Sequence, residues 1–310
     1  MAQAPWAVVV VNYRSHRLLE RNLVPLVTAL VQGGPGEQAA GGAVVVVDNF
    51  SDDAERAAVR RLGDAHGWRV LTAPNDGFGA GVNLGADAAL ADGAQVLAVL
   101  NPDLSITPAA LLSLVDGVRQ DPSTLVGPQV VDAAGRPSRA GGLDWRRGAT
   151  VPLGPAGATD LSPDWLTGAC LVTSASLWRT LGGFAPDYGM YWEDVDLSVR
   201  AVATGARLVL RTDVEAVHDA GGTQEHAGAR RKSDLYYRAN CRSRLVFAAA
   251  HLDAAGRARW ALRSAGYARA VVLRGGRRQL LRTPRPALAA ASGTLSGLWY
   301  LLRTPRAVPS

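Results

Sequence analysis

The 310-residue sequence has little cysteine and no long hydrophobic run. Its two cysteines, Cys170 and Cys241, lack the spacing of a metal-binding or redox motif, so a reduced, cytoplasmic environment is expected. No stretch reaches the ~20 apolar residues of a membrane-spanning helix. The apolar run 7–11 is too short for a signal peptide and has no basic segment before it. The segment 287–302 is apolar but interrupted by Ser, Thr and Gly, which favours a helix lying on a surface.

Acidic residues are scarce in the last quarter of the chain. Residues 226–310 contain 17 arginines and lysines but only Asp234 and Asp253, a balance of +15. The whole chain has a formal charge of +6, so the part before residue 226 carries −9. A basic tail behind an acidic front predicts an anionic partner, either membrane phospholipid or nucleic acid. Because no nucleic-acid-binding module is recognisable, we expect no nucleic acid partner and a peripheral position at the inner face of the plasma membrane.

The order of apolar runs predicts an α/β protein. Continuous apolar runs, typical of buried parallel strands, alternate with segments of helical periodicity. Such alternation implies a mostly parallel central sheet with flanking helices, whose ligands bind at the carboxyl ends of the strands. The predicted strands cover residues 7–11, 43–47, 68–71, 96–100, 126–131, 165–172, 207–210 and 214–217.

The connections and the tail complete this outline. Ser15 is expected to cap a first helix that ends near Leu30, and residues 136–163 are expected to form an irregular excursion near the site. We expect residues 1–225 to form the α/β domain and residues 226–310 a basic, mainly helical extension. Its first helix is predicted to be amphipathic from the positions of Tyr236, Tyr237, Leu245 and Phe247.

Polar residues follow several of the predicted strands. Asn12, Asp48 and Asn75 fall at or just past strand ends. Asp103 follows the strand 96–100 after a proline. A carboxylate there suits a divalent cation, although an ordinary turn after proline explains it as well. His218 follows a strand and precedes two glycines, a place from which a metal can be reached.

The loop before the third predicted helix, which ends near Leu90, is rich in glycine. Gly77, Gly79 and Gly81 allow a backbone to approach a ligand closely, and the helix N-terminus that follows suits phosphate or ribose. The spacing differs from the G-x-G-x-x-G fingerprint, and the loop does not follow the first strand. A plain turn between strand and helix is therefore the alternative.

Aromatic residues run directly into three carboxylates near position 190. Glu193 and Asp194 fall in the first turn of a predicted helix, where the helix dipole favours negative charge. Asp196 and Arg200 are four residues apart and can pair on one face. A well-capped amphipathic helix explains this pattern, and so does a base acting on a sugar hydroxyl at the end of an aromatic platform. Trp192 either stacks on a sugar or packs into the core.

These motifs and their order resemble glycosyltransferase family 2, and within it the bacterial rhamnosyltransferases that build cell-wall and polysaccharide linkages. The resemblance implies a GT-A nucleotide-diphospho-sugar transferase fold and an inverting transferase, with L-rhamnose from dTDP-rhamnose as the leading donor. The implied acceptor is a hydroxyl of a glycan or of a polyprenyl-diphosphate-linked glycan. The resemblance covers about residues 6–222 and rests on the segments 9–13, 47–51, 75–79, 83–85, 101–103, 168–169 and 192–197 together with His218.

The resemblance also implies roles for single residues. Asp194 would be the general base, and Asp103 and His218 would hold a divalent cation, Mg²⁺ or Mn²⁺, at the donor diphosphate. Asp48 would hold the nucleobase. Asn101 is a departure, because the family usually has the first of two metal-binding aspartates there, and its absence removes a negative charge. The other residues expected at the substrates are Asn12, Asn49, Asn75, Gly77, Asn83, Gly168, Trp192 and Glu193.

Three alternatives stay open. Another nucleotide sugar, such as a UDP-hexose, or a small-molecule acceptor would use the same fold. A nucleotide-sugar-binding scaffold without activity would also keep the fold, although the presence of Asp103, Asp194 and His218 argues against it. The arginines of the tail could bind an acceptor diphosphate instead of a membrane.

Overall fold

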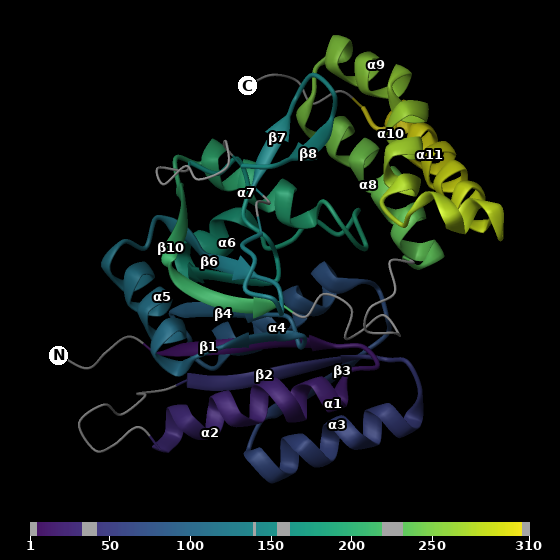
Figure 1. Ribbon diagram of the computed structural model, residues 1–310. Helices are drawn as coiled ribbons and strands as arrows, with labels where there is room; N and C mark the ends of the chain where they lie inside the picture. Colours follow the sequence, from purple (N-terminus) through teal and green to yellow (C-terminus); the bar gives the residue numbers. More distant parts are fainter. Residues whose placement is uncertain (1–4, 33–41, 139–140, 154–161, 219–231, 306–310) are drawn as a thin grey trace.

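The computed structural model describes residues 5–32, 42–138, 141–153, 162–218 and 232–305. In this part of the chain a central β-sheet is covered by helices on both faces (Figure 1). The helices that follow residue 232 pack together beyond the sheet, at the upper right of Figure 1. The arrangement confirms the predicted α/β class with a helical C-terminal region.

The sheet of the described residues has eight strands in the order β3-β2-β1-β4-β9-β6-β10-β5. β9 and β5 run antiparallel to their neighbours, whereas the other strands are parallel to one another. The sheet is therefore mostly parallel, as predicted. Its strands are β1 (Trp6–Asn12), β2 (Gly42–Asn49), β3 (Arg69–Ala73), β4 (Val96–Leu100), β5 (Leu104–Ile106), β6 (Thr124–Val131), β9 (Cys170–Ser174) and β10 (Arg207–His218).

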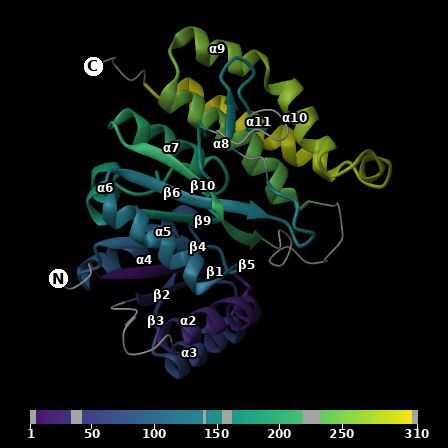
Figure 2. The same cartoon turned by 60° about the vertical axis from the view of Figure 1, so that its left-hand side comes forward.

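Two hydrophobic layers hold helices against the sheet. Figure 2 shows the helices beside the strands. Alternate residues of β1 point to opposite faces, so Val8 and Val10 join one layer and Val9 and Val11 join the other. The first layer packs against α2, α3 and α5, and the second against α4, α6 and α7. The helical elements of this part of the chain, including the short first turns, are α1 (His16–Leu18), the π turn η1 (Leu19–Leu23), α2 (Val24–Gln32), α3 (Asp53–His66), α4 (Phe78–Ala91), α5 (Pro108–Gln120), α6 (Ala175–Leu181) and α7 (Glu193–Ala203).

Several local elements differ from the prediction. The strand expected at 165–172 begins only at Cys170, and the two strands expected at 207–217 are one strand, β10, whose register shifts between Arg211 and Glu215. The excursion 136–163 contains the hairpin of β7 (Gly142–Asp144) and β8 (Ala149–Val151). Ser15 lies at the N-cap position of the first helix, but its side chain makes no capping hydrogen bond. Its hydroxyl accepts from Tyr13 N at 3.3 Å and donates to Asn12 Oδ1 at 2.9 Å.

The tail contributes a third hydrophobic cluster. Tyr237, Leu245 and Phe247 are completely buried, as the apolar face of the predicted amphipathic helix would be. Every residue from Ser243 to Ala249 is buried, however, so that part of the helix has no solvent-facing side. The same cluster includes Trp192 and Val195 at the start of α7, so it crosses the boundary expected at residue 225. The division into two domains stays a prediction. The tail elements are α8 (Asp234–His251), α9 (Ala254–Leu262), α10 (Ser264–Leu273), the 3₁₀ turn η2 (Arg277–Leu281) and α11 (Arg285–Arg303).

Candidate active site

The carboxyl ends of β1, β2 and β4 meet at one edge of the sheet. β1 is parallel to both neighbours, with Asn12 opposite Asp48 and Val10 opposite Leu100. The segment that follows β4 therefore leaves the sheet at the same edge as the polar ends of β1 and β2. This edge is where parallel α/β sheets bind their ligands.

A buried polar cluster lies at the end of β1 and β2. Asn12 Nδ2 donates to Asp48 Oδ1 at 3.3 Å and to Glu55 Oε1 at 3.1 Å. His16 contacts both carboxylate oxygens of Glu55, through its backbone N at 2.8 Å and its Nδ1 at 2.5 Å. Burial alone would raise the pKa of Glu55, but the hydrogen bonds from His16 and Asn12 lower it. Glu55 and His16 were missed because only the fold brings them to the strand ends.

Asp48 also pairs with an arginine that the sequence reasoning overlooked. Arg56 Nε donates to Asp48 Oδ2 at 3.0 Å, and the guanidinium carbon lies 4.4 Å from the ring centroid of Phe50. Phe50 is 38% exposed, whereas Asp48 is buried. A guanidinium stacked on an exposed ring offers a flat surface for a nucleobase beside the carboxylate. The role of Asp48 toward the nucleobase remains a prediction.

The glycine-rich loop before α4 lies against the loop before α7. Asn49 Nδ2 donates to Gly77 O at 2.9 Å, and Phe78 N donates to Gly189 O at 3.1 Å. Gly77 has φ +102°, and a Cβ added there would lie 2.1 Å from Gly189 O. The close approach that requires glycine is therefore to the protein's own backbone, while contact of Gly77 with a ligand stays a prediction.

The end of β4 places Asp194 near the predicted metal ligands. Asn101 N donates to Ala169 O at 2.9 Å, so Gly168 lies beside the residues that follow β4. Gly168 N in turn donates to Asp194 Oδ2 at 3.0 Å. Since Asp103 is two residues beyond Asn101, the candidate base and the candidate metal ligand lie at the same end of β4.

Asp103 and His218 lie at hydrogen-bonding distance, which two neighbouring ligands of one divalent cation would also have. Asp103 Oδ1 and His218 Nε2 are 3.0 Å apart. Neighbouring ligands at about 2.1 Å from an octahedral cation would be about 3.0 Å apart, so the pair fits such an ion. No cluster of three or more His, Cys, Asp or Glu residues that could hold a metal occurs within the described residues. A cation held by this pair would need further oxygens from the donor diphosphate or water.

Glu193 and Asp194 begin α7 in different environments. Burial raises the pKa of Asp194, but the backbone N–H groups of Gly168 and Val195 donate to its carboxylate and oppose this rise. Glu193 is 8% exposed, and its Oε2 has no hydrogen-bond partner among the described residues. Burial, and then the charge of Asp194, raise the pKa of Glu193 to about 8. At neutral pH the proton of this pair therefore belongs on Glu193 and the negative charge on Asp194.

Asp196 is held in a separate network that faces away from Gly168. The predicted pair with Arg200 is confirmed, with Arg200 Nε 2.8 Å from Asp196 Oδ2. Asp196 Oδ1 also accepts from Tyr188 OH at 3.1 Å and lies 2.7 Å from His251 Nε2. Burial would raise the pKa of Asp196, but the contacts with His251 and Arg200 lower it. The carboxylate therefore joins α7 to α8 and is not free to act as a base.

Trp192 packs into the core, which was one of its two predicted positions. It is 3% exposed, its Nε1 donates to Tyr267 OH at 3.3 Å, and its ring contacts those of Phe247 and Trp260. Its side chain cannot stack on a sugar in this arrangement, so its inclusion among the substrate-binding residues is corrected.

Asn83 has a structural role. Its Nδ2 donates to Phe184 O and its Oδ1 accepts from Phe184 N, both at 2.8 Å. These bonds hold α4 to the turn before α7 and use one N–H and one lone pair of the amide, so the place of Asn83 at the nucleotide stays a prediction. Asn75 is exposed in the loop before α4, and its role at the donor remains a prediction.

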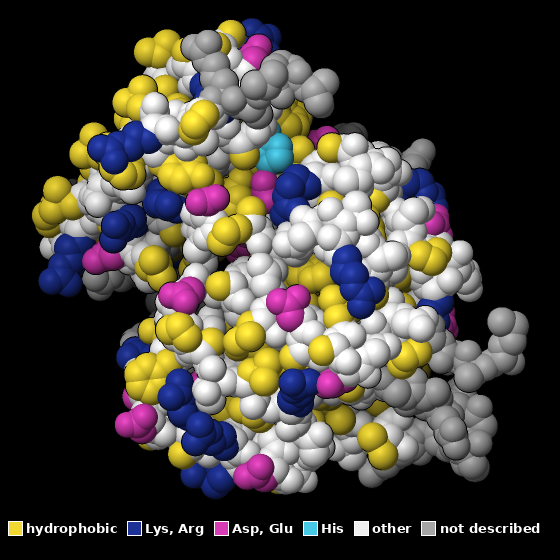
Figure 3. Space-filling model, turned by 180° about the vertical axis from the view of Figure 1, so that it is seen from behind, with side chains coloured by type: hydrophobic (Ala, Val, Ile, Leu, Met, Phe, Trp, Pro, Cys, Tyr) yellow, Lys and Arg dark blue, Asp and Glu magenta, His cyan; other side chains and the backbone are white. Residues whose placement is uncertain are grey.

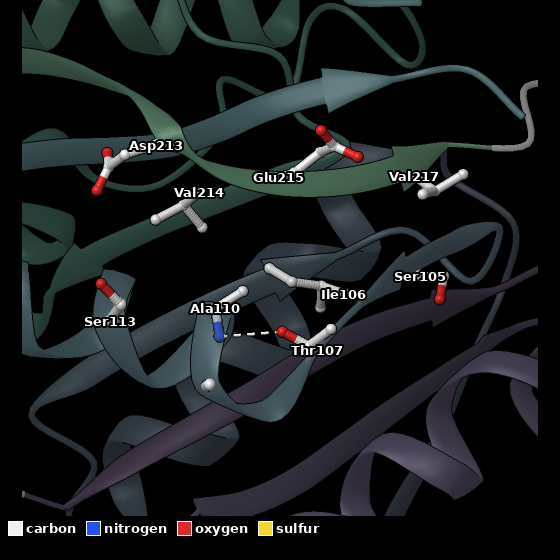
Figure 4. Close-up of a pocket in the computed structure, with 10 residues that line it drawn as sticks. Ser105, Ile106, Thr107, Ala110, Ser113, Asp213, Val214, Glu215 and Val217 are labelled. Carbon is white, nitrogen blue, oxygen red and sulfur yellow. Dashed lines mark hydrogen bonds between the residues drawn. The ribbon is translucent and has the colours of Figure 1, made fainter. Parts of the chain in front are cut away.

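A groove of about 530 Å³ lies elsewhere, between β5, β10 and α5 (Figure 4). Its lining includes Ser105, Glu215 and Val217. Neither Asp103 nor His218 is among the residues that line this groove.

Comparison with known proteins identifies the family. The model of the family described as "Glycosyl transferase family 2" matches residues 8–175, more than half of the chain. The chain belongs to glycosyl transferase family 2. This family 2 chain is 32% identical over 204 residues to the N-acetylglucosaminyl-diphospho-decaprenol L-rhamnosyltransferase of Mycobacterium tuberculosis, covering 56% of the chain and 66% of that protein. It is 24% identical over 219 residues to a hexosyltransferase of low-salt glycan biosynthesis from Haloferax volcanii, covering 69% of the chain and 66% of that protein.

Solved structures share the fold of this family 2 chain. The mannosyltransferase from Pyrobaculum calidifontis, in complex with GDP-mannose and Mn²⁺, superposes with a TM-score of 0.51 at 17% identity. The match covers 97% of this chain and 79% of that one. The expected GT-A fold, with its mostly parallel sheet, is thereby confirmed.

Proposed function

We propose that this family 2 protein is an inverting glycosyltransferase. It moves a sugar from a nucleotide-diphospho-sugar to a hydroxyl of a glycan or lipid-linked glycan in cell-wall or polysaccharide synthesis. The observation that carries the proposal is the position of Asp194, on Gly168 N at the end of β4, near the Asp103–His218 pair. This edge of the sheet also holds the polar cluster around Asp48, where a nucleoside can be recognised.

The chain's own residues supply the proton transfer that such a reaction needs. Asp194 accepts the proton of the acceptor hydroxyl while the oxygen attacks the anomeric carbon on the side opposite the leaving diphosphate. Protonated Glu193 leaves Asp194 as the only charged carboxylate of the pair. A divalent cation at Asp103 and His218, when bound, would neutralise charge on the leaving diphosphate.

The donor and acceptor are proposed from a relative. We propose L-rhamnose from dTDP-rhamnose as the donor sugar, because the 32% identical relative is named as an L-rhamnosyltransferase. That relative's name includes a decaprenyl diphosphate, which supports a polyprenyl-diphosphate-linked acceptor here. A peripheral position at a membrane would bring the protein to such an acceptor. Within the described residues, no helix is both long and apolar enough to span a bilayer.

A donor-binding panel tests the proposal. Thermal unfolding would be measured with dTDP-rhamnose, UDP-glucose and GDP-mannose, each with and without Mn²⁺, because a ligand that binds the native state raises Tm. We expect the largest rise with dTDP-rhamnose and Mn²⁺, and loss of the metal-dependent part in Asp103→Ala. Failure of every nucleotide sugar to raise Tm contradicts the proposed function. Full activity in the presence of a strong chelator contradicts only the metal role.

A further inference from the structure

The last helix of the chain has one face against the protein and an apolar face turned outward. Toward α8 it presents small residues: a Cβ added at Gly293 would lie 2.0 Å from Arg238 O, and one added at Gly297 would lie 2.9 Å from the side chain of Leu245. On the other side, Leu288, Leu295, Trp299 and Leu302 are 63%, 67%, 56% and 85% exposed. At 3.6 residues per turn these four positions fall within about 60° of the helix circumference. They form a continuous outer stripe, which we call the α11 stripe.

Basic side chains border the α11 stripe, and acidic ones are absent from this part of the sequence. From residue 254 to the end there are eleven arginines and no Asp or Glu. The guanidinium carbon of Arg303 lies 4.0 Å from the ring centroid of Trp299. On the helical region, at the upper left of Figure 3, basic side chains lie among hydrophobic ones.

α9 extends the same chemistry beyond the end of α11. The two helices are tied together, because Arg257 NH1 donates to Thr304 O at 3.1 Å. α9 ends at Leu262, which is 86% exposed, and Arg259 and Arg263 beside it are exposed as well. Both helices thus end in an exposed leucine followed by an exposed arginine, Leu262 with Arg263 and Leu302 with Arg303.

We propose that the α11 stripe docks on an anionic phospholipid surface, with its leucines and Trp299 inserted and the arginines at the headgroups. An interfacial helix combines apolar residues on one face with basic residues beside them, and its binding adds apolar burial to attraction for anionic lipid. A second copy of the chain is a poor occupant, because a two-fold contact would place this arginine-bordered surface against itself. The inference gives the proposed membrane-linked acceptor a docking surface, but its test does not depend on transferase activity.

Sedimentation of the full chain with vesicles tests the inference. Vesicles of phosphatidylcholine alone would be compared with equal parts of phosphatidylcholine and phosphatidylglycerol. We expect binding to the anionic vesicles that falls as salt rises, because exposed charges are screened. Leu295→Ser combined with Leu302→Ser should weaken this binding at least about tenfold. Val31→Ser, on α2, replaces a residue that is 79% exposed and should leave the binding unchanged.

A second pair of variants tests the contribution of charge to vesicle binding. Arg303→Gln should weaken vesicle binding about fivefold, the scale for one basic residue at an anionic surface. Arg60→Gln removes the same charge from the exposed face of α3 and should have no such effect. Far-ultraviolet circular dichroism and Tm establish that each variant is folded.

Three outcomes would overturn the inference. They are equal binding of wild type and the leucine double variant to anionic vesicles, no binding by wild type at low salt, and a dimer in solution that the double variant converts to a monomer. Rhamnosyl transfer to a soluble acceptor analogue should be the same in wild type and all four α11 and control variants. Loss of vesicle binding with transfer retained therefore separates this inference from the proposed function.

Discussion

Replacing Glu193 with glutamine should stabilise the protein, and increasingly so as pH rises. The carboxyl is 8% exposed, and burial together with the charge of Asp194 raises its pKa from 4.5 to about 8. Between these two values the unfolded chain releases the proton while the folded chain keeps it. Stability therefore falls as pH rises through this range, because the folded state binds more protons.

The size of the stabilisation follows from the difference between the folded and unfolded pKa values of Glu193. Each unit of pKa difference corresponds to about 1.4 kcal/mol, so Glu193 costs at most about 5 kcal/mol of unfolding free energy by pH 8. Glutamine has a similar shape and no ionisation. The difference in unfolding free energy between Glu193→Gln and wild type should therefore be small near pH 4.5, grow toward pH 8 and stay constant above it.

Urea denaturation of both proteins at intervals from pH 5 to pH 9 measures this difference. Glu55→Gln is a control of opposite sign, because the hydrogen bonds of Glu55 lower its pKa, so its contribution is already complete above the unfolded pKa of 4.5. That variant should be less stable than wild type by a nearly constant amount from pH 6 to pH 9. A pH-independent difference for Glu193→Gln would show that Glu193 is not held protonated.

Three other substitutions test the hydrogen bonds around the site and the packing of α11 on α8. Asp196→Asn breaks the network with Arg200 and His251 and should lower the free energy of unfolding, measured by urea denaturation, by about 3–5 kcal/mol at pH 7. Because the pKa of Asp196 is lowered in the folded state, wild type should lose this advantage only as pH falls below about 4. Equal stability of the two proteins at pH 7 would contradict it. Asn83→Ala should lower the free energy of unfolding by about 1–3 kcal/mol, since two backbone groups of Phe184 lose partners, and equal stability would contradict this. Calorimetry of donor binding then distinguishes a structural role alone, with affinity near wild type, from the predicted role at the nucleotide, with a large loss of affinity. Gly293→Ala should lower Tm, because the added Cβ would meet Arg238 O. Gly266→Ala is the control and should leave Tm unchanged, because a Cβ added there has no atom within 4 Å. Equal Tm values for the two variants would mean that α11 does not pack on α8 in this way.

Much of the sheet could be predicted from local sequence. Continuous valine runs such as 8–11 and 44–47 form buried parallel strands, because both faces of each strand are covered. The pair of Asp196 with Arg200 could also be predicted, since a helix alone brings positions four apart together. The place of Glu193 and Asp194 at the helix start could be predicted as well, because the helix dipole favours negative charge in the first turn.

The remaining features depend on contacts between distant segments. His251 meets Asp196 across 55 residues of sequence, and Trp192 is buried by Phe247, Trp260 and Tyr267. No local pattern indicates these neighbours, so the choice between sugar stacking and core packing could not be made from the sequence. The register shift in β10 likewise follows from its pairing with β6, which only the assembled sheet defines.

The charge of the tail also did not show which of its arginines are buried. Its count of arginines predicted an exposed basic region, yet Arg244 is completely buried. Arg244 donates to backbone carbonyls such as those of Gly148 and Trp260, and burial lowers its pKa to about 10, so it stays charged at neutral pH. Part of the basic composition therefore serves the internal packing of the tail on the hairpin.

The turnover of Asp194→Asn compared with Glu193→Gln tests the assignment of the base most directly. Asparagine keeps the shape of the side chain but cannot accept the acceptor's proton. We predict that Asp194→Asn lowers kcat by about two or more powers of ten, the scale of a general base, with donor affinity little changed. Glu193→Gln should keep much of the activity, because Glu193 is already neutral at pH 7. Near-normal turnover in Asp194→Asn together with an inactive Glu193→Gln would place the base one residue earlier, and activity in both would leave the start of α7 without a catalytic role.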